Sequence, residues 1–321
     1  MRRGQGPLLE ALWDRRLLLI SGKGGVGKST LSAAIARAAV RAGRTVLLAE
    51  LTPGLEGPSM LGPLVGAREP GPEVTQVEPG LSFVRLAAPS GHRRFLQDVL
   101  PLRLMADAAM RSRALRRFLE AGPALWEMGV MYHLLDLVRH TGKDGGFAHP
   151  LCVVDLPATG HALALASLPR SLLTVLPGGP IGRAVREGFG LLQDTRQTAV
   201  LLATLPEPLP VSEALQLEGE MRELGLPLAA ALLNRMPDNP FPEPHSRAAL
   251  DTLLAAHGPH EGSRALARLD VARSSHVRLS AGLSAPVLCL PERPATGPAL
   301  VEQLAEALSP ARARQRAGGT S

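Results

Sequence analysis

The stretch Ser21-Gly22-Lys23-Gly24-Gly25-Val26-Gly27-Lys28-Ser29-Thr30 decides the fold of this chain. It follows an apolar run at residues 17–20 and precedes an alanine-rich segment with helical spacing at residues 29–41. A strand, a glycine-rich loop and a helix in this order are what a phosphate-binding loop requires. The stretch therefore predicts an α/β fold with a phosphate site where the first strand meets its helix.

The residue types in this loop suit the binding of phosphate. Glycines let the backbone curl so that its N–H groups point inward and bind an anion, and the helix that starts near Lys28 adds the positive end of its dipole. Lys28 suits the lysine that reaches the β- and γ-phosphates, and Ser29 suits the hydroxyl that binds Mg²⁺. Thr30 can donate to the α-phosphate. The residues expected to bind the nucleotide are Gly22, Lys23, Gly24, Gly25, Val26, Gly27, Lys28, Ser29 and Thr30.

Lysine usage sets this loop apart from the rest of the chain. The chain has three lysines, Lys23, Lys28 and Lys143, and its other basic residues are arginines. Two of the three therefore lie inside one short loop, where we interpret them as chemically required.

The composition describes a globular chain with an aliphatic core. Of its 321 residues, 45% are hydrophobic and 3% are aromatic. A chain of this length can form one large α/β domain or two smaller ones. No run of about 18 apolar residues suggests a membrane span, and the first residues lack a signal-peptide pattern. We therefore expect a cytoplasmic protein whose two cysteines, Cys152 and Cys289, are reduced thiols in buried strands.

The net charge of +6 comes partly from the last residues of the chain. Residues 310–321 are rich in arginine and glycine and predict a disordered basic tail. A solvated tail is one interpretation, and contact with nucleic acid or an anionic lipid is the other.

Apolar runs of strand length recur between helical patterns along the chain. Several are apolar throughout, as in parallel strands covered on both faces, and together they predict a doubly wound, mostly parallel α/β sheet. No internal repeat is visible, so residues 1–309 are expected to form one nucleotide-binding domain. The expected strands are residues 17–21, 45–51, 81–85, 151–156, 198–204, 228–234 and 287–290, separated by helices such as 29–41, 211–224 and 298–308.

Two segments interrupt this alternation. Residues 52–80 are rich in proline and glycine and predict a long loop that can include a short helix. Residues 92–141 contain helical patterns without a strand and predict a helical subdomain inserted between strands. Half of the chain's eight methionines lie in this insertion, and they suit either an adaptable surface for apolar ligands or an ordinary helix core. They are Met105, Met110, Met128 and Met131.

A second part of the phosphate site is expected after the strand at 151–156. This buried run contains Asp155, in the position of an aspartate that holds the Mg²⁺ shell opposite the loop serine. An acid at a strand end is common, so the prediction depends on the loop upstream. Thr159 or the Gly160 N–H group can sense the γ-phosphate, whereas for His161 a helix-start residue with local hydrogen bonds is the plainer interpretation.

At these positions the chain resembles a known family. The loop GKGGVGKST at 22–30 looks like the deviant phosphate loop of the ParA, MinD and nitrogenase-iron-protein class. Three further runs are similar to the arsenite-pump and tail-anchored-protein-targeting ATPases, and the resemblance covers about residues 15–309. They are DLPATGHALALASLP at 155–169, ATLPEPLPVSEA at 203–214 and ALLNR at 231–235, with residues 286–291 fitting the last strand and adenine loop of that family.

The resemblance implies ATP as the nucleotide and Mg²⁺ as its metal ion. Ser29 and Asp155 would organise the Mg²⁺, and Asn234 with the backbone around Pro291 would hold adenine. Lys23 would be the signature lysine that reaches a phosphate bound by the partner subunit, which requires a homodimer that closes on ATP. The helical insertion at 92–141 would match the client-binding region of that family.

Three departures from the family pattern qualify this picture. Thr52 precedes Pro53 where the family has the aspartate that positions the attacking water, and Glu50, two residues earlier, is the candidate substitute. No Cys-x-x-Cys is present for the zinc clasp of some members. Two distant cysteines cannot supply the clustered thiols of an arsenite site, so arsenite transport is not expected.

The sequence thus predicts a dimeric Mg²⁺-dependent ATPase whose nucleotide state opens and closes a helical surface for a protein client, for example an apolar membrane-protein segment. The alternative is a nucleotide-gated scaffold with slow or no hydrolysis, which Thr52 favours. A weaker alternative is a ParA-like or MinD-like positioning protein on DNA or a membrane surface, which only the basic tail supports.

Overall fold

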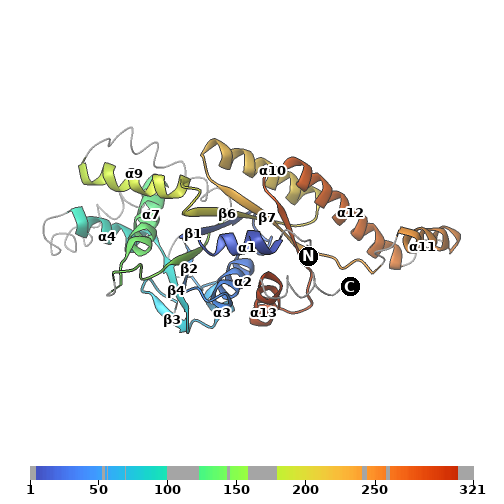
Figure 1. Ribbon diagram of the computed structural model, residues 1–321, viewed down its shortest axis with the longest axis horizontal. Helices are drawn as coiled ribbons and strands as arrows, with labels where there is room; N and C mark the ends of the chain where they lie inside the picture. Colours follow the sequence, from blue (N-terminus) through green and yellow to red (C-terminus); the bar gives the residue numbers. More distant parts are fainter. Residues whose placement is uncertain are drawn as a thin grey trace.

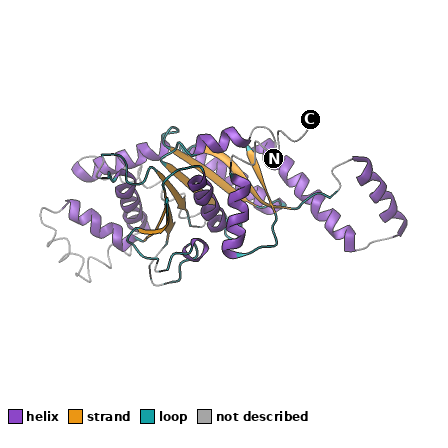
Figure 2. Ribbon diagram, turned by 60° about the horizontal axis from the view of Figure 1, so that its bottom comes forward, coloured by secondary structure: helices purple, strands orange, loops and turns teal. Residues whose placement is uncertain are grey.

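An eight-stranded sheet organises the part of the chain that the computed structural model describes, residues 5–52, 55, 57–68, 70–99, 123–142, 145–157, 179–240, 244–257 and 261–309. Figure 1 and Figure 2 show this sheet between two layers of helices. The spatial order is β3-β4-β2-β5-β1-β6-β7-β8. The strands are β1 Leu17–Gly22, β2 Val46–Leu51, β3 Thr75–Glu78, β4 Leu81–Leu86, β5 Leu151–Asp155, β6 Thr198–Thr204, β7 Leu228–Met236 and β8 Val287–Pro291.

The sheet is parallel except at one edge. All neighbouring strands from β4 to β8 pair in parallel, and the edge strand β3 pairs antiparallel with β4. β1 lies in the middle, between β5 and β6, with Ile20 opposite Asp155 and Gly22 opposite Ala203. The carboxyl end of β1 therefore lies where the chain winds away in both directions, the usual place for a ligand in such a sheet. The predicted doubly wound α/β fold is confirmed.

Two helical layers cover the faces of the sheet. Leu12, at the end of α1, joins α2 and α13 in the core of one face, while buried residues of α7, α9, α10 and α12 pack on the other. Both cores are mainly aliphatic, as the low aromatic content predicts, and Phe83 and Trp13 are aromatic residues buried in the first. The helices of the two layers, with the short α3, are α1 Gln5–Leu12, α2 Lys28–Arg41, α3 Gly62–Val65, α7 Pro123–Arg139, α9 Gly179–Gln193, α10 Pro208–Glu223, α12 Glu261–Gly282 and α13 Gly297–Leu308.

Small residues let α2 pack closely on the sheet. Five alanines of α2 are fully buried, at positions 33, 34, 36, 38 and 39, and Leu31 and Ile35 fill the spaces between them. Burial of a leucine or isoleucine contributes about 1.5–3 kcal/mol relative to exposure. The helix after the phosphate loop is thus held against the centre of the sheet, which fixes the position of the loop.

The segment at 52–80 contains more structure than the loop that its composition predicts. It includes the short helix α3, which was expected, and the edge strand β3, which was not. β3 lacks an apolar pattern because its residues are exposed or half-buried. The proline and glycine content of this segment therefore indicated a loop at residues where the structure has a strand.

The predicted helical insertion at 92–141 is described only in part. α4 (Ala88–Val99) and α7 lie within or beside it, and residues 100–122, which include Met105 and Met110, lie outside the described residues. α7 buries Val130 and Leu134 in the sheet core, and Met131 packs at the edge of that core. α7 is therefore also a covering helix of the sheet, and the extent of the insertion stays a prediction. The expected tail at 310–321 likewise lies outside the described residues.

A helical pair that the sequence analysis did not identify lies between β7 and β8. α11 (Pro244–His257) and α12 extend away from the sheet edge in Figure 1 and Figure 2. Arg247 of α11 donates to both carboxylate oxygens of Asp270 of α12, at 3.0 and 2.7 Å. Among the helices that the structure describes, none combines the length and apolarity needed to cross a membrane.

Candidate functional site

The loop between β1 and α2 has backbone geometry that only glycine supplies at two positions. Gly22 has φ 145°, and a Cβ atom there would lie 2.3 Å from the carbonyl oxygen of Ala203. Gly27 has φ 93°, and a Cβ atom there would lie 2.6 Å from Nδ2 of Asn234. Close backbone approach and left-handed conformation explain these glycines without reference to a ligand. They leave the curled loop with its N–H groups available for an anion.

Val26 and Asn234 hold the phosphate loop against the sheet. Val26 is buried, whereas Lys23, Gly24 and Gly25 are exposed. Nδ2 of Asn234, at the end of β7, donates to the backbone oxygen of Val26 at 2.9 Å. Asn234 therefore supports the phosphate loop in this structure, and its predicted contact with adenine stays a prediction.

The segment around Pro291 lies beside Asn234 on the neighbouring strand. Pro291 ends β8 opposite Met236 of β7, and the N–H of Glu292 donates to Met236 O at 2.8 Å. Arg268 of α12 hydrogen-bonds the carboxylate of Glu292 and lowers its pKa. Arg235, directly after Asn234, has φ 55°, a conformation that is rare for a residue with a side chain and typical of functional sites. The predicted adenine residues are thus brought together at the carboxyl ends of β7 and β8.

Lys28 lies folded over the loop at the start of α2. Its Nζ donates to the backbone oxygen of Lys23 at 2.9 Å. Burial lowers the pKa of the Lys28 ammonium, and the nearby Asp155 opposes that effect. A cation that is partly removed from water interacts more strongly with a phosphate than a solvated one.

Asp155, at the end of β5, is buried beneath the first turn of α2. Its Oδ2 accepts from Ser29 Oγ at 2.7 Å, and its Oδ1 accepts from Ser32 Oγ at 3.0 Å. Burial raises the pKa of Asp155 to about 6, although the two serine hydrogen bonds and Lys28 favour the charged form. The sequence analysis did not identify Ser32, although it follows Ser29 by three residues and thus lies on the same face of the helix.

Ser29 and Asp155 fit the binding of Mg²⁺. They offer a hydroxyl and a carboxylate oxygen, the ligand type that Mg²⁺ prefers, and they meet beside the phosphate loop. When bound in such a site, Mg²⁺ neutralises charge on the phosphate oxygens. The residues that would hold it are those that the sequence predicts.

Lys23 points away from the chain's own loop and toward α10. Its Nζ lies 3.5 Å from Oε1 of Glu213, and its side chain is 44% exposed. An exposed pair of this kind contributes little to stability, so the lysine is free to exchange partners.

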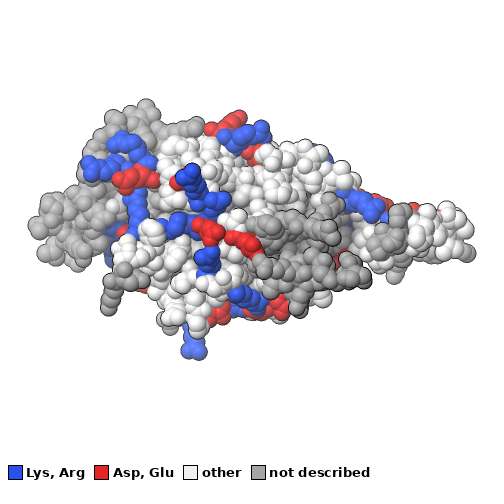
Figure 3. Space-filling view, in the orientation of Figure 1, with Lys and Arg blue, Asp and Glu red and all other residues white. Residues whose placement is uncertain are grey.

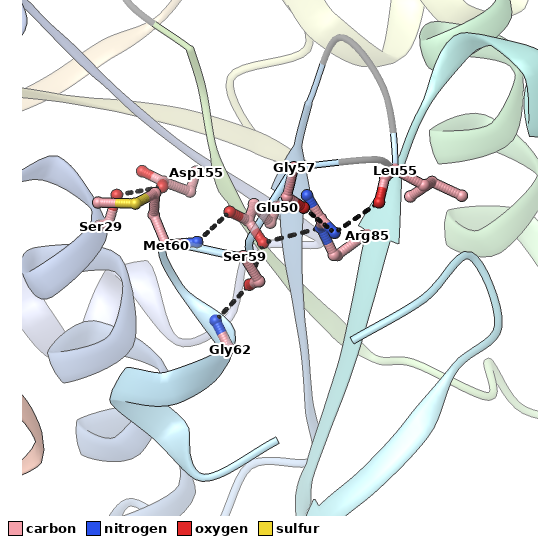
Figure 4. A network of polar contacts seen from close by, with 9 residues as sticks. All are labelled: Ser29, Glu50, Leu55, Gly57, Ser59, Met60, Gly62, Arg85 and Asp155. Carbon is pink, nitrogen blue, oxygen red and sulfur yellow. Dashed lines mark hydrogen bonds and ion pairs between the residues drawn. The ribbon is translucent and has the colours of Figure 1, made fainter. Parts of the chain in front are cut away.

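Glu50, the candidate substitute for the missing aspartate, is buried at the end of β2. Its carboxylate accepts hydrogen bonds from Ser59 and from the Met60 N–H group and lies beside Arg85, as Figure 4 shows. Thr52 lies just beyond β2, and its N–H donates to Leu86 O at 3.0 Å. Pro53, Thr159, Gly160 and His161 lie outside the described residues.

The two cysteines lie on different strands of the sheet. Cys152 is buried in β5, and burial raises its pKa to about 12, which keeps the thiol protonated. Cys289 in β8 is half-buried, so the expectation that both are buried is wrong for this residue. β1, β6 and β7 separate β5 from β8, and the two cysteines are not joined in a disulfide.

The fold and the loop together define a P-loop nucleotide-binding protein. Residues 15–177, just over half of the chain, match the family model of the anion-transporting ATPases, and the chain belongs to that family. It is therefore a nucleotide-binding ATPase of the family that also includes the arsenical pump-driving ATPases.

Named proteins with similar sequences agree with this assignment. The chain is 29% identical over 237 residues to the ATPase BagA of Mycobacterium tuberculosis, covering 73% of this chain and 69% of that protein. A putative ATPase of Mycobacterium bovis has the same identity and coverage. The chain is also 28% identical over 236 residues to an arsenical pump-driving ATPase of Escherichia coli, covering 68% of this chain and 36% of that protein.

Proposed function

We propose that the chain hydrolyses ATP in a Mg²⁺-dependent reaction and uses the nucleotide state to switch between an open and a closed homodimer. The single observation that carries the proposal is the contact of Ser29 with Asp155 at 2.7 Å, directly under the loop over which Lys28 folds. A hydroxyl, a carboxylate and an ammonium at one end of a P-loop are the groups that phosphoryl transfer needs. The reaction class is cleavage of the β–γ phosphoanhydride.

In this proposal, residues of the chain have the following roles in ATP binding and hydrolysis. The loop backbone at residues 22–30 binds the phosphate oxygens, and Lys28 stabilises charge on the β- and γ-phosphates. Ser29 and Asp155 hold Mg²⁺, and Ser32 orients the Asp155 carboxylate through its hydrogen bond. Asn234 and the backbone at Pro291 hold the adenine ring. ATP turnover by the purified protein, with and without Mg²⁺, is the direct test.

Lys23 supports the dimeric part of the proposal. Its exposed ammonium is paired with Glu213 instead of lying over its own phosphate loop. In a closed dimer it would leave Glu213 for a phosphate on the partner subunit, which adds positive charge opposite the transferred group. ATP would then stabilise the dimer because it binds the closed form better than the open one.

Replacement of Lys23 by alanine is expected to weaken ATP-dependent dimerisation and to lower turnover by a factor on the order of 10–100, because one cation is lost from the transition state. ATP binding by the single chain should be retained, since Lys28 and the loop backbone remain. Sedimentation velocity with a non-hydrolysable ATP analogue measures the dimerisation.

The matched control is Glu213→Gln, which removes the charge of the pairing partner and leaves Lys23 in place. This variant should dimerise with ATP at least as well as the wild type. Wild-type kinetics and dimerisation in Lys23→Ala would exclude the cross-subunit role.

The proposed client is a protein segment that contacts the helical insertion at 92–141. The described part of this region places Met131 on α7, at the edge of the sheet core. Clients can be sought as proteins that co-purify with a nucleotide-trapped variant blocked in hydrolysis and are absent with the nucleotide-free protein. Recovery of the same proteins in both states would argue against a nucleotide-controlled client site.

A nucleotide-gated scaffold with little hydrolysis is the second candidate. Thr52 stands where the family has the water-positioning aspartate, and the carboxylate of Glu50 is engaged by Ser59, Met60 and Arg85. A single-turnover assay separates the two candidates: formation of ADP from pre-bound ATP within minutes supports the enzyme, and intact ATP supports the scaffold.

Positioning on DNA or a membrane surface is a weaker candidate. On the face shown in Figure 3, the coloured basic and acidic side chains are interspersed, without one extended basic area among them. Non-specific binding to nucleic acid depends on phosphate neutralisation and weakens steeply with salt. Retention on DNA at low salt that is lost at high salt would support this candidate.

A further inference from the structure

Three charged side chains form a row across adjacent strands at the edge of the phosphate site. Arg85 of β4 is opposite Glu50 of β2, and Glu50 is opposite Asp155 of β5. All three are buried, with exposures of 4%, 6% and 7%. The sheet thus places a buried ion pair directly beside the carboxylate that we assign to Mg²⁺.

Glu50 is tied to the segment that follows its own strand. Its Oε1 accepts from the Met60 N–H group at 2.9 Å, and its Oε2 accepts from Ser59 Oγ. Ser59 Oγ also accepts from the Gly62 N–H group at 2.7 Å, at the first residue of α3. Both carboxylate oxygens of Glu50 therefore hold the chain in place just before it enters α3, as Figure 4 shows.

Arg85 contacts an earlier part of the same segment. Its Nη1 donates to the backbone oxygens of Gly57 and Leu55 at 3.1 and 3.5 Å, while its Nε lies 3.4 Å from Oε2 of Glu50. One ion pair thus contacts this segment at residues 55, 57, 59 and 60. Burial of two charges is costly unless they are paired and hydrogen-bonded. The segment supplies hydrogen bonds to both charges, so its displacement would leave them buried without these partners.

We infer that Glu50, Arg85 and Ser59 form a clamp that positions the segment after β2 against the phosphate site, and that Glu50 is a positioning residue and not the group that activates water. The inference rests on the proposed ATPase activity and adds its positioning residues. The clamped residues, which lie between Leu55 and Met60, come shortly after Thr52 in the sequence, where the family places its water-positioning aspartate. Both oxygens of Glu50 already accept hydrogen bonds from this segment, and Oε2 lies beside Arg85, so the contacts of Glu50 are those of a residue that holds the segment in place.

Two substitutions test the clamp, and the chain offers a matched control for each. Ser59→Ala removes one hydroxyl from the clamp, and Glu50→Gln removes its negative charge. A second buried glutamate, Glu218 of α10, is likewise paired with an arginine, Arg222, and accepts from Ser284 Oγ at 3.2 Å. Ser284→Ala and Glu218→Gln therefore make the same chemical changes outside the phosphate site.

The first readout is amide hydrogen exchange of the nucleotide-free protein, which does not depend on hydrolysis. We expect residues 57–62 to exchange about 10-fold faster in both clamp variants, since Ser59→Ala removes the acceptor of the Gly62 N–H group and Glu50→Gln weakens the acceptor of the Met60 N–H group by removing its charge. The controls should leave this segment unchanged. Unchanged exchange of residues 57–62 in both clamp variants would overturn the inference, even if the wild-type protein proved to have no ATPase activity.

The second readout is the division of the kinetic effect between kcat and ATP affinity. A displaced segment should lower kcat by about 10-fold with little change in ATP affinity, because a small misplacement of a catalytic segment costs rate and not binding. Ser59→Ala and Glu50→Gln should not be additive, since they break the same clamp. If Glu50→Gln abolished turnover while Ser59→Ala behaved as wild type and exchange stayed unchanged, Glu50 would act on water directly and the clamp would be excluded.

Discussion

The Lys28→Ala variant is expected to lose ATP turnover by a factor on the order of 10²–10³, the effect of removing one preorganised charge donor from a transition state. Lys28 is the ammonium that folds over the loop, within hydrogen-bonding distance of Lys23 O. Its partial burial, which lowers its pKa, also strengthens its interaction with a phosphate relative to a fully solvated cation. Steady-state ATPase assays at saturating Mg²⁺ and ATP measure the loss, and a fluorescent nucleotide measures the accompanying fall in affinity.

Lys28→Arg is the matched control for charge. Arginine keeps the positive charge but presents it as a planar fork, which does not fit a site built for a point charge. We expect it to retain more nucleotide affinity than Lys28→Ala without restoring turnover. Wild-type turnover in Lys28→Ala, with an unchanged thermal unfolding midpoint, would exclude the phosphate site at residues 22–30.

Local sequence patterns were sufficient for the centre of this fold. Strands buried on both faces are apolar throughout, so β1, β5 and β6 were predicted within one residue of their bounds. The phosphate loop was equally visible, since Gly22 and Gly27 are required by backbone geometry. Asp155 could be proposed because an acid at the end of a buried strand, downstream of a phosphate loop, suits the Mg²⁺ aspartate, and the structure places β5 next to β1.

Features that depend on contacts between distant residues could not be predicted in this way. β3 is short and half-exposed, and the pattern for α11 and α12 is weak because these helices are exposed on several sides. The clamp requires Arg85, Glu50 and Ser59 to meet, and only strand order brings Arg85 beside Glu50. The sequence could indicate Glu50 as a candidate for positioning the attacking water. Its hydrogen bonds and its ion pair with Arg85, which only the structure shows, are the basis for the positioning role that we infer.

Replacement of Asp155 by asparagine is expected to remove Mg²⁺-dependent turnover, with a loss on the order of 100-fold or more, because the carboxylate charge is what the metal ion and its waters need. Asparagine has the same shape and can still accept a hydrogen bond from Ser29 or Ser32. The defect should therefore appear as a weakened response to Mg²⁺ in a titration of turnover. Binding of ATP without Mg²⁺ should be preserved.

The same substitution is expected to leave the nucleotide-free protein at least as stable as the wild type. Burial raises the pKa of Asp155 to about 6, so at pH 7.5 the empty fold holds a charge that the unfolded chain would carry at lower cost. Asparagine removes that charge, and the thermal midpoint should stay equal or rise. Loss of turnover together with a retained midpoint would show that Asp155 serves the reaction at the expense of stability, as functional residues often do. A fall in both would instead assign Asp155 to the support of the fold. Ser32→Ala, which removes the hydrogen bond to Oδ1 and the one from Ser32 Oγ to the Lys28 backbone oxygen, would then show the same fall in smaller measure.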